Sequence, residues 1–391
     1  MIAFLFYVEN VCMQKIYNSG ENSMKLMEAS IECLKENMQN KKVIAFSASD
    51  FLKMIAKNYA ELELEKNISY IVDNDISKQG IEFDVCGIKK RVCNPNIIKK
   101  EKNENIVIII SSDVYVYEIY EQLNEMIKDS DVPVFALSLV ISKNIDDKTN
   151  KSMFAVEKHQ IPKIIHYFWF SGEEKDEMTN KCINSWKKCC SDYEIVEWNS
   201  HNYDVTKNEF AYEAFKNRKW AYVSDFARLD VIYEYGGIYL DADVRLFQSL
   251  DCLLGNDMFM AFGPLREIEA ATIGACKHNE LIKKMLGLYF GKKFDANRTL
   301  GLLDVQPFLL ENVVQTEGFC IDGKYQIING NALFPRDLFS GKNWFTGEYE
   351  YGEIALGVHE CAGNWAKGNR RQTKRNQNKA IEKIYNTMVI G

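Results

Sequence analysis

The stretch Gly236-Gly237-Ile238-Tyr239-Leu240-Asp241-Ala242-Asp243 is the most informative part of this 391-residue chain. Its three apolar residues predict a short buried strand, and two carboxylates one residue apart follow the end of that strand. Side chains at positions i and i+2 of a strand point to the same side, so Asp241 and Asp243 can converge on one cation. Hard divalent ions such as Mg²⁺ take oxygen ligands, often carboxylates together with substrate phosphates. The stretch therefore predicts a site at which a metal ion holds a diphosphate.

An Asp-x-Asp pair alone is most often a solvated turn, and the preceding residues change that interpretation. Trp220 to Tyr235 carry apolar side chains on much of the surface of a predicted helix. Asp225 and Arg228 are three residues apart and project from one face of it. A buried helix rarely carries charges unless they are paired or used. Gly236-Gly237 then ends the helix and permits a tight turn into the strand.

Three segments resemble glycosyltransferase family 32, the DXD-containing capsular-polysaccharide type with the GT-A fold. They are Ile161–Gly172, Trp220–Val244 and Val358–Trp365, of which the middle one is the most specific. The middle segment is also similar, more distantly, to the glucosyltransferase domain of large clostridial toxins. The resemblance implies an α/β fold, with a GT-A nucleotide-sugar transferase domain over residues 160–368.

The resemblance also implies a metal site made by Asp241, Asp243 and His359. Asp243 would bind Mn²⁺ or Mg²⁺ directly, Asp241 would face the ribose and the metal's water shell, and His359 would approach from the C-terminal side. A cation at this position stabilises the negative charge that develops on a departing diphosphate. Imidazole is also a suitable ligand for Mn²⁺. Asp241 and Asp243 are accordingly catalytic candidates as well as metal ligands.

The implied donor contacts add five side chains to Asp241. Asp225 and Arg228 match an Asp-x-x-Arg pattern that contacts hydroxyls of the donor sugar in the toxin relatives. Tyr239 would line the nucleotide pocket, Trp169 would stack on the base, and Trp365 would cover the donor. Arginine offers forked donors with a permanent charge, and indole offers a flat stacking surface.

Structural alternatives stand beside several of these roles. Trp169 belongs to an apolar predicted strand, where a tryptophan is as often core as ligand-binding. His166 in the same strand is more typical of a structural histidine. His359 follows apolar Leu356-Gly357-Val358, where a lone histidine is ordinarily unremarkable, but the following residues Cys361 to Trp365 favour a ligand. Trp365 is either a lid over the donor or part of the core.

The chain also departs from the family pattern. Family members often show a second histidine where Glu360 stands, and an asparagine where Ala270 stands. A threonine-glycine-proline run near the chemistry is replaced by Thr299 to Asp304. Asp304 and Gln306 are the candidates for a polar catalytic group beneath the sugar. These departures affect the contacts that select the sugar rather than the metal site.

Residues 1–150 predict a separate Rossmann-like accessory domain, because strands alternate with helices as in a parallel sheet. The predicted strands are 43–46, 69–72, 106–110 and 133–137, and the predicted helices are 24–38, 51–65 and 114–128. The turn from Ser47 to Phe51 lacks the glycines that a dinucleotide needs, and Asp50 would repel phosphate. A vestigial or partner-binding domain is therefore favoured over a second cofactor site. Residues 141–160 are polar and charged, which predicts a solvated connector.

Composition is consistent with an intracellular enzyme. The net charge of −7 does not indicate a nucleic-acid partner. Eleven cysteines without a C-x-x-C pair indicate reduced cytoplasmic thiols. The apolar residues 1–8 are too short to span a bilayer and predict a strand or docking segment. The basic, amphipathic residues 369–391 can rest on anionic lipid at the inner membrane face, or they form a solvated terminal helix.

Together these inferences predict a metal-dependent glycosyltransferase that moves a hexose from a nucleoside diphosphate sugar to a capsular or other cell-surface glycan. UDP is the favoured nucleotide, a lipid-linked saccharide is a possible acceptor, and the resemblance implies retention of anomeric configuration. The alternative is a catalytically silent GT-A-fold scaffold or carbohydrate-binding protein of the same pathway. A nucleotidyltransferase would also use paired aspartates and a metal, but the chain lacks a glycine-rich phosphate loop.

Overall fold

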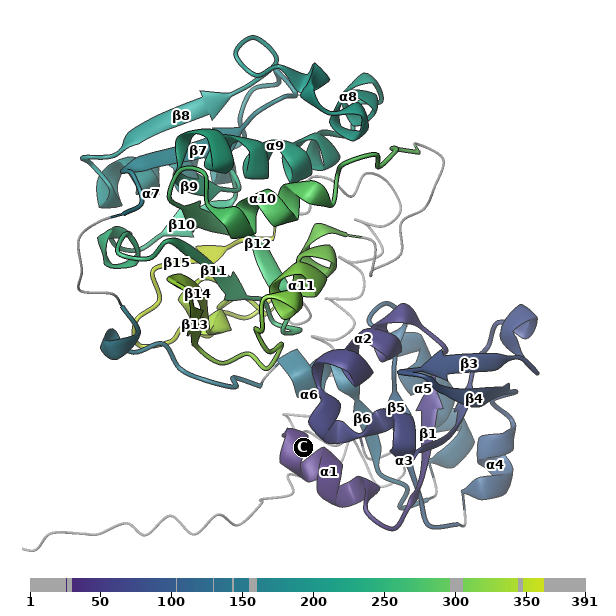
Figure 1. Ribbon diagram of the computed structural model, residues 1–391. Helices are drawn as coiled ribbons and strands as arrows, with labels where there is room; N and C mark the ends of the chain where they lie inside the picture. Colours follow the sequence, from purple (N-terminus) through teal and green to yellow (C-terminus); the bar gives the residue numbers. More distant parts are fainter. Residues whose placement is uncertain are drawn as a thin grey trace, which may run out of the picture. The chain divides into compact units, whose positions relative to one another are not determined.

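The computed structural model describes residues 26, 30–102, 104–128, 130–142, 144–154, 160–295, 305–343 and 347–361. These residues form two compact units (Figure 1). Among them, the first unit ends at Asn144, and the second begins at Ile145. The predicted segment 1–8 and the predicted tail 369–391 lie outside the described residues.

Unit 1 is built on a six-stranded sheet of order β3-β4-β2-β1-β5-β6. All neighbouring strands pair in parallel except the β3–β4 hairpin. The strands are β1 (Lys42–Phe46), β2 (Ile68–Val72), β3 (Glu82–Val85), β4 (Ile88–Cys93), β5 (Ile106–Ile110) and β6 (Val134–Ala136). The helices are α1 (Ile31–Met38), α2 (Asp50–Asn58), α3 (Leu64–Asn67), α4 (Ile97–Glu101), α5 (Val116–Ile127) and α6 (Leu137–Ser142).

The predicted parallel α/β arrangement of unit 1 is confirmed, with two differences. The helix expected over 51–65 is interrupted, because Tyr59 leaves helical geometry and Glu63 has a φ of +46°. The β3–β4 hairpin was not predicted, because its strands expose polar side chains and lack an apolar run. By contrast, all five residues of β5 are buried, as expected for a central parallel strand covered on both faces.

In the turn between β1 and α2, side chains of the protein hydrogen-bond to the backbone groups. The Ala48 N–H donates to the Asp73 carboxylate at 2.8 Å, and Lys78 Nζ donates to the Ala48 carbonyl at 2.9 Å. The Ser49 hydroxyl caps α2 by accepting from the Leu52 N–H at 3.1 Å. Two N–H groups that a bound phosphate would use are therefore already hydrogen-bonded, one of them to a carboxylate that repels anions.

Unit 2 is built on a seven-stranded mixed sheet of order β13-β14-β11-β12-β9-β7-β8 and a separate β10–β15 ribbon. The sheet strands are β7 (Ile164–Phe168), β8 (Glu194–Trp198), β9 (Gly237–Leu240), β11 (Met258–Phe262), β12 (Ile268–Ala275), β13 (Gln326–Ile328) and β14 (Asn331–Phe334). The ribbon pairs β10 (Val244–Leu246) with β15 (Gly357–His359). The helices are α7 (Glu177–Cys189), α8 (Glu209–Lys216), α9 (Trp220–Tyr235), α10 (Glu280–Gly287) and α11 (Gln306–Thr316). This mixed α/β unit is consistent with the predicted GT-A fold.

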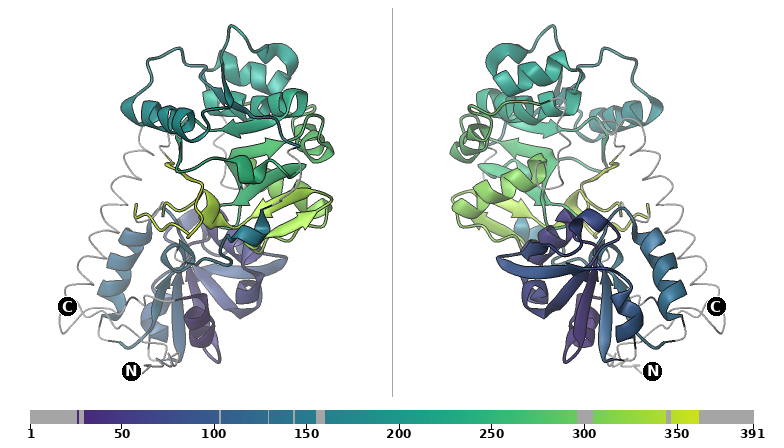
Figure 2. Two further views of the ribbon diagram at one scale, coloured as in Figure 1. Left: turned by 90° about the vertical axis from the view of Figure 1, so that its left-hand side faces the viewer. Right: turned by 90° about the vertical axis from the view of Figure 1, so that its right-hand side faces the viewer.

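Alternating side chains of β9 separate the two hydrophobic cores of unit 2. Tyr239 faces the core that α8, α9, α10 and α11 share with the sheet. The ribbon views show the helices of unit 2 lying on both faces of its sheet (Figures 1 and 2). Ile238 and Leu240 point to the face opposite to Tyr239, where they pack with α7. Trp186 of α7 is fully buried there, and its indole N–H donates to the Val244 carbonyl at 2.7 Å. The segment after β9 is thereby fixed from both faces of the sheet.

The junction between α9 and β9 follows the sequence prediction closely. The helix spans Trp220 to Tyr235, and Gly236 caps it with a φ of +67°. Gly237 has a φ of +99°, and a Cβ at this position would lie 2.7 Å from the Ile164 carbonyl oxygen. Only glycine fits both the conformation and the close approach of β7. The two glycines therefore fix where β9 begins and where its terminal carboxylates lie.

The prediction of a solvated connector over 141–160 is wrong for several of the described residues. Asp146 forms an ion pair with Arg266, and both side chains are about nine-tenths buried. The Thr149 N–H and hydroxyl both donate to the buried Asp337 carboxylate. Met153 packs into the hydrophobic core of unit 2. Polar composition misled the prediction, because the partners that allow burial lie more than 100 residues away in the sequence.

His166 of β7 is a structural histidine, as the sequence favoured. Its Nε2 bonds the Gly236 carbonyl at 2.9 Å, and its Nδ1 accepts from the Trp198 indole N–H at 3.1 Å. Burial lowers the pKa of His166 from 6.5 to about 4, against a smaller opposite effect of the Gly236 hydrogen bond. His166 is therefore neutral at physiological pH, with its proton on Nε2.

This burial predicts a pH-dependent stability of unit 2. The unfolded chain takes up the His166 proton as pH falls through 6.5, whereas the folded protein does so only near 4. The stabilisation present above pH 6.5 is therefore lost as pH falls, up to about 3 kcal/mol. Urea unfolding followed by tryptophan fluorescence measures it, because all six tryptophans lie at or beyond position 169. His166→Gln should flatten the dependence relative to the exposed control His201→Gln, and equal slopes in the two variants would refute the assignment.

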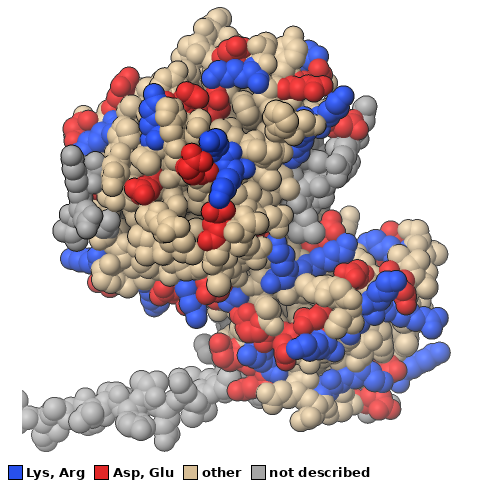
Figure 3. Space-filling view, viewed as in Figure 1, with Lys and Arg blue, Asp and Glu red and all other residues tan. Residues whose placement is uncertain are grey.

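The described surface carries both charge signs. On the face shown in Figure 3, Lys and Arg are interspersed with Asp and Glu on both units. The net charge of −7 is therefore not gathered into one acidic patch on this face. Among the described residues, no helix has the length and apolar character required to cross a lipid bilayer.

Candidate metal and donor site

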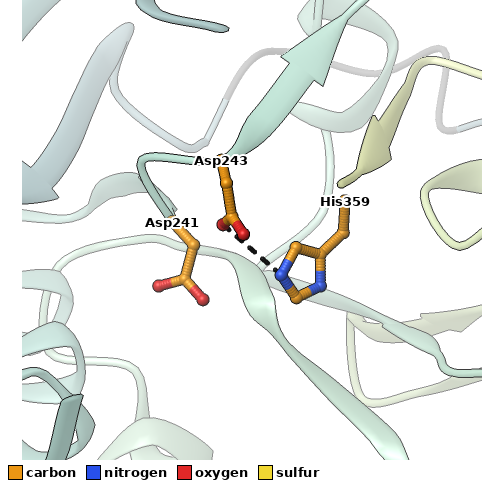
Figure 4. A group of neighbouring side chains, drawn as sticks. All are labelled: Asp241, Asp243 and His359. Atoms are coloured by element: carbon orange, nitrogen blue, oxygen red, sulfur yellow. Dashed lines mark ion pairs between the residues drawn. The ribbon is translucent and has the colours of Figure 1, made fainter. Parts of the chain in front are cut away.

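Asp241, Asp243 and His359 come together where β9 ends. Asp241 and Asp243 follow β9, and His359 is the last residue of β15. The antiparallel β10–β15 pairing places His359 opposite Val244, and so beside Asp243. One potential ligand atom from each of the three side chains lies within 4.8 Å of the other two (Figure 4). The structure thus brings together the three residues predicted to bind a metal.

Asp243 and His359 form a direct contact, drawn as a dashed line in Figure 4. Asp243 Oδ1 lies 3.4 Å from His359 Nε2, and each side chain is less than one-fifth exposed. Burial acts to lower the pKa of His359, but Cys361 and the Asp243 and Glu269 carboxylates outweigh it and raise that pKa well above its ordinary range. Without a cation, a proton on Nε2 therefore occupies the position between ring and carboxylate. A metal ion would replace that proton.

The Asp241 carboxylate is held by two neighbours through one oxygen. The Tyr239 hydroxyl donates to Oδ1, and Arg228 Nη2 lies 3.5 Å from the same oxygen. Oδ2 remains available for a cation or its water, since the hydrogen bonds described for this carboxylate all use Oδ1. Tyr239 is only 2% exposed, and its hydroxyl contacts Asp241. Its predicted nucleotide contact stays a prediction.

Arg228 projects from α9 and links several parts of the site. Its Nε donates to the Ser224 carbonyl at 3.1 Å, and its Nη1 donates to the Ala270 carbonyl of β12 at 2.7 Å. Its Nη2 lies 3.3 Å from Asp225 Oδ1. The guanidinium also lies over the Tyr239 ring, 4.7 Å from the ring centroid. Arg228 is thus a buried permanent cation in a fixed orientation beside two carboxylates.

Asp225 has a largely buried carboxyl group next to Arg228. Burial raises the pKa of its carboxyl to about 6, Asp241 adds to the increase, and Arg228 opposes it. Above pH 6 the side chain is therefore mostly an acceptor, as binding of sugar hydroxyls requires. Gln306 is attached to the backbone of the same residue, because its Nε2 donates to the Asp225 main-chain carbonyl at 2.5 Å.

Gln306 has a buried side-chain amide whose oxygen is not hydrogen-bonded to any described residue. It is 2% exposed, and its Nε2 also donates to the Tyr289 hydroxyl at 2.9 Å. Within the described part of the chain, its Oε1 has no hydrogen-bond partner. An acceptor in this state is suited to bind a ligand hydroxyl. The other polar candidate, Asp304, lies outside the described residues.

Trp169 lies at the same edge of the sheet as the two aspartates. It directly follows β7, which pairs in parallel with β9, so both strands end at one edge. In α/β sheets, ligands bind at the carboxyl ends of the strands. The ring is partly buried against the core, its indole N–H donates to the Glu173 carbonyl at 2.7 Å, and Lys175 Nζ lies 5.2 Å from its centroid. Both alternatives stay open for Trp169, while Trp365 lies outside the described residues.

Glu360, at the position of the family's second histidine, points away from the metal group. Its carboxylate accepts from Arg245 Nε at 3.0 Å, from the Tyr349 hydroxyl and from Lys342 Nζ at 3.3 Å. Adjacent residues of an extended chain face opposite sides, so His359 and Glu360 cannot both face Asp243. The substitution therefore leaves the ligand group formed by Asp241, Asp243 and His359 intact.

The donor set fits a divalent cation. Two carboxylates and one imidazole supply two oxygens and one nitrogen, a combination that suits Mn²⁺, while the carboxylates alone suit Mg²⁺. The remaining coordination positions would be open to water and to phosphate oxygens, as in other sites that bind nucleotide diphosphates.

Residues 176–260 match the glycosyltransferase sugar-binding region containing DXD motif. This segment contains α9, Asp241 and Asp243. The chain is 35% identical over 121 residues to inositol phosphoceramide mannosyltransferase 3 of Schizosaccharomyces pombe, covering 28% of this chain and 32% of the relative. It is 24% identical over 181 residues to inositol phosphoceramide mannosyltransferase 1 of the same yeast, covering 44% and 52%.

The chain therefore spans between a third and about half of the length of these relatives. Among solved structures, the PaToxG glycosyltransferase matches 40% of this chain and 69% of its own, at 18% identity and a TM-score of 0.33. The matched family model and both yeast relatives carry glycosyltransferase names.

Two side chains of the site were missed by the sequence reasoning. Glu269 of β12 lies 3.3 Å from His359 Nδ1, and the Tyr289 hydroxyl accepts from Gln306. The signal for Glu269 was a lone carboxylate in the stretch Ile268 to Ala275, which is otherwise apolar except for Thr272. Tyr289 had no comparable signal, because a tyrosine near the end of an amphipathic helix is usually core.

Proposed function

We propose that this protein is a metal-dependent glycosyltransferase that moves a hexose from a nucleoside diphosphate sugar to a hydroxyl of a glycan or lipid-linked saccharide. The observation that carries the proposal is the convergence of Asp241, Asp243 and His359 at the carboxyl end of β9. The match of residues 176–260 to a DXD sugar-binding region supports the same assignment.

Each part of the site has a task in this reaction. A divalent cation held by Asp241, Asp243 and His359 would supply positive charge for the departing diphosphate. Arg228 and Tyr239 hold Asp241 in one orientation, so the site needs little reorganisation when the donor binds. In this proposal, the Asp225 carboxylate and Gln306 Oε1 would be the acceptors for sugar hydroxyls.

The donor and acceptor belong to the proposal in this form. UDP is the favoured nucleotide, with glucose, galactose or N-acetylglucosamine as sugar, and a capsular or other cell-surface glycan as acceptor. The names of the two yeast relatives favour mannose as a second candidate sugar. The family 32 resemblance also implies retention, which the anomeric proton coupling of the product would report.

A donor-hydrolysis screen with the full chain tests the proposal. UDP-glucose, UDP-galactose, UDP-N-acetylglucosamine and GDP-mannose are each incubated with Mn²⁺, with Mg²⁺ or with EDTA, and the released nucleotide is measured. We expect one donor to release its nucleoside diphosphate in the presence of metal, with EDTA abolishing the release. Thermal shifts on addition of each donor with Mn²⁺ provide a parallel readout of binding.

The screen also separates the catalytically silent alternative. A scaffold protein would show a metal-dependent thermal shift with a donor but no nucleotide release, even with glycan acceptors added. If no donor gives a thermal shift and none releases its nucleotide, the proposed function itself is contradicted. Release of pyrophosphate from a nucleoside triphosphate would instead indicate a nucleotidyltransferase.

A further inference from the structure

Glu269 contacts the proposed metal site from behind His359. Its Oε2 lies 3.3 Å from His359 Nδ1, on the opposite side of the ring from the Nε2 that faces Asp243. Glu269 is 9% exposed and belongs to a strand whose eight residues are all buried. A carboxylate in such a place requires partners, because burial of an unpaired charge is costly.

The Glu269 carboxylate is held in place by the protein. Its Oε1 accepts from the Ala271 N–H at 3.0 Å, and its Oε2 accepts from the Ser340 hydroxyl at 3.2 Å. Both carboxylate oxygens therefore accept hydrogen bonds from the protein. The carboxylate is thus a fixed acceptor for a proton on His359 Nδ1.

Three consecutive residues of β12 support the site together. Glu269 contacts His359, the Ala270 carbonyl accepts from Arg228, and the Ala271 carbonyl accepts from the Asp241 N–H at 2.8 Å. The position of Glu269 is therefore set by the same strand that sets the positions of Arg228 and Asp241. A change in this strand would move all three together.

We propose that Glu269 is a positioning residue for His359, an inference that rests on the proposed function. Glu269 holds the His359 ring with a proton on Nδ1 and with Nε2 directed at the metal. A histidine ligand usually donates its second ring N–H to a carboxylate or carbonyl, which fixes the ring and strengthens the ligand. Glu269 is not itself one of the metal ligands, because the compact ligand group among the described residues consists of Asp241, Asp243 and His359. It acts through His359.

The test compares Glu269→Gln with the matched control Glu267→Gln. Glu267 lies two residues away and is equally 9% exposed. Burial, together with Glu269, raises the pKa of Glu267 to about 8, so it is mostly protonated at pH 7 and glutamine preserves its charge. Mn²⁺ binding is measured by titration at pH 7, and pulsed EPR detects the nitrogen of a histidine bound to Mn²⁺.

We expect Glu269→Gln to weaken Mn²⁺ binding about 10- to 100-fold and to reduce the histidine-nitrogen coupling. Glu267→Gln should keep both within about threefold of the wild-type values. Because Glu269→Gln changes a buried group, Ser340→Ala serves as a milder second variant that removes one hydrogen bond to Oε2. It should weaken binding several-fold in a fully folded protein.

Unchanged Mn²⁺ affinity and unchanged nitrogen coupling in folded Glu269→Gln would overturn the inference and leave the proposed function standing. An equal loss of Mn²⁺ affinity in Glu269→Gln and Glu267→Gln would also overturn it. The loss would then follow from any change in this segment and not from the contact with His359. Absence of Mn²⁺ binding by the wild-type protein would refute the proposed function together with this inference.

Discussion

Asp243→Asn is expected to lower donor turnover by about 10³-fold while leaving the thermal transition nearly unchanged. Asparagine has almost the same shape, but it removes the negative charge beside His359 and one anionic ligand from the proposed cation site. Charge at this position matters most when the diphosphate departs, so the loss should appear in turnover. Nucleotide release under saturating donor and Mn²⁺ measures it, with melting temperature as the check on folding.

A matched control for this variant is Asp192→Asn. Asp192 is 62% exposed in its side chain and pairs only with Lys163 among the described ion pairs. An exposed pair of this kind contributes little to stability. The control should therefore retain full turnover. A folded Asp243→Asn protein with wild-type turnover would refute the assignment of Asp243 to the metal site.

Arg228→Lys is expected to lower kcat/KM for the donor about 100-fold, although the charge is kept. The guanidinium contacts the Ser224 and Ala270 carbonyls and two carboxylates at once. A lysine ammonium is a single point and cannot reach all four. Because Asp241 then loses its fixed neighbour, donor binding should suffer along with turnover.

The same substitution should also destabilise unit 2 by about 2 kcal/mol, since at least one charge-assisted hydrogen bond inside the protein is lost. Steady-state kinetics across donor concentration and urea unfolding by tryptophan fluorescence measure the two effects. Arg218→Lys, at an exposed position, is the control and should change neither. Equal kinetics for Arg228→Lys and wild type would make Arg228 a structural residue only.

The parts of the fold that the sequence predicted well are governed by local signals. The helix from Trp220 to Tyr235 follows from its apolar content, and Gly236 and Gly237 end it because their positive φ values and close contacts exclude other residues. The placement of Asp241 and Asp243 after β9 follows from the same short segment. Each of these features is decided by residues that are neighbours along the chain.

The parts that the sequence did not predict depend on distant partners. Asp146 and Thr149 looked solvated, because Arg266 and Asp337 are brought to them only by the folded chain. His359 reaches Asp243 through the pairing of β10 with β15, more than 100 residues apart, and the sequence suggested this only through the family resemblance. Glu269 was missed for the same reason, since its role becomes visible only beside His359. Single-sequence patterns do not contain such pairings.

The most direct test of the central claim is an EPR titration of Mn²⁺ into the full chain, with and without UDP or GDP, in wild type and Asp243→Asn. We expect one tight Mn²⁺ per wild-type chain, bound more tightly in the presence of one of the nucleotides, and a loss of that binding in the variant. No bound Mn²⁺ in the wild type, or identical binding in both proteins, would contradict that claim.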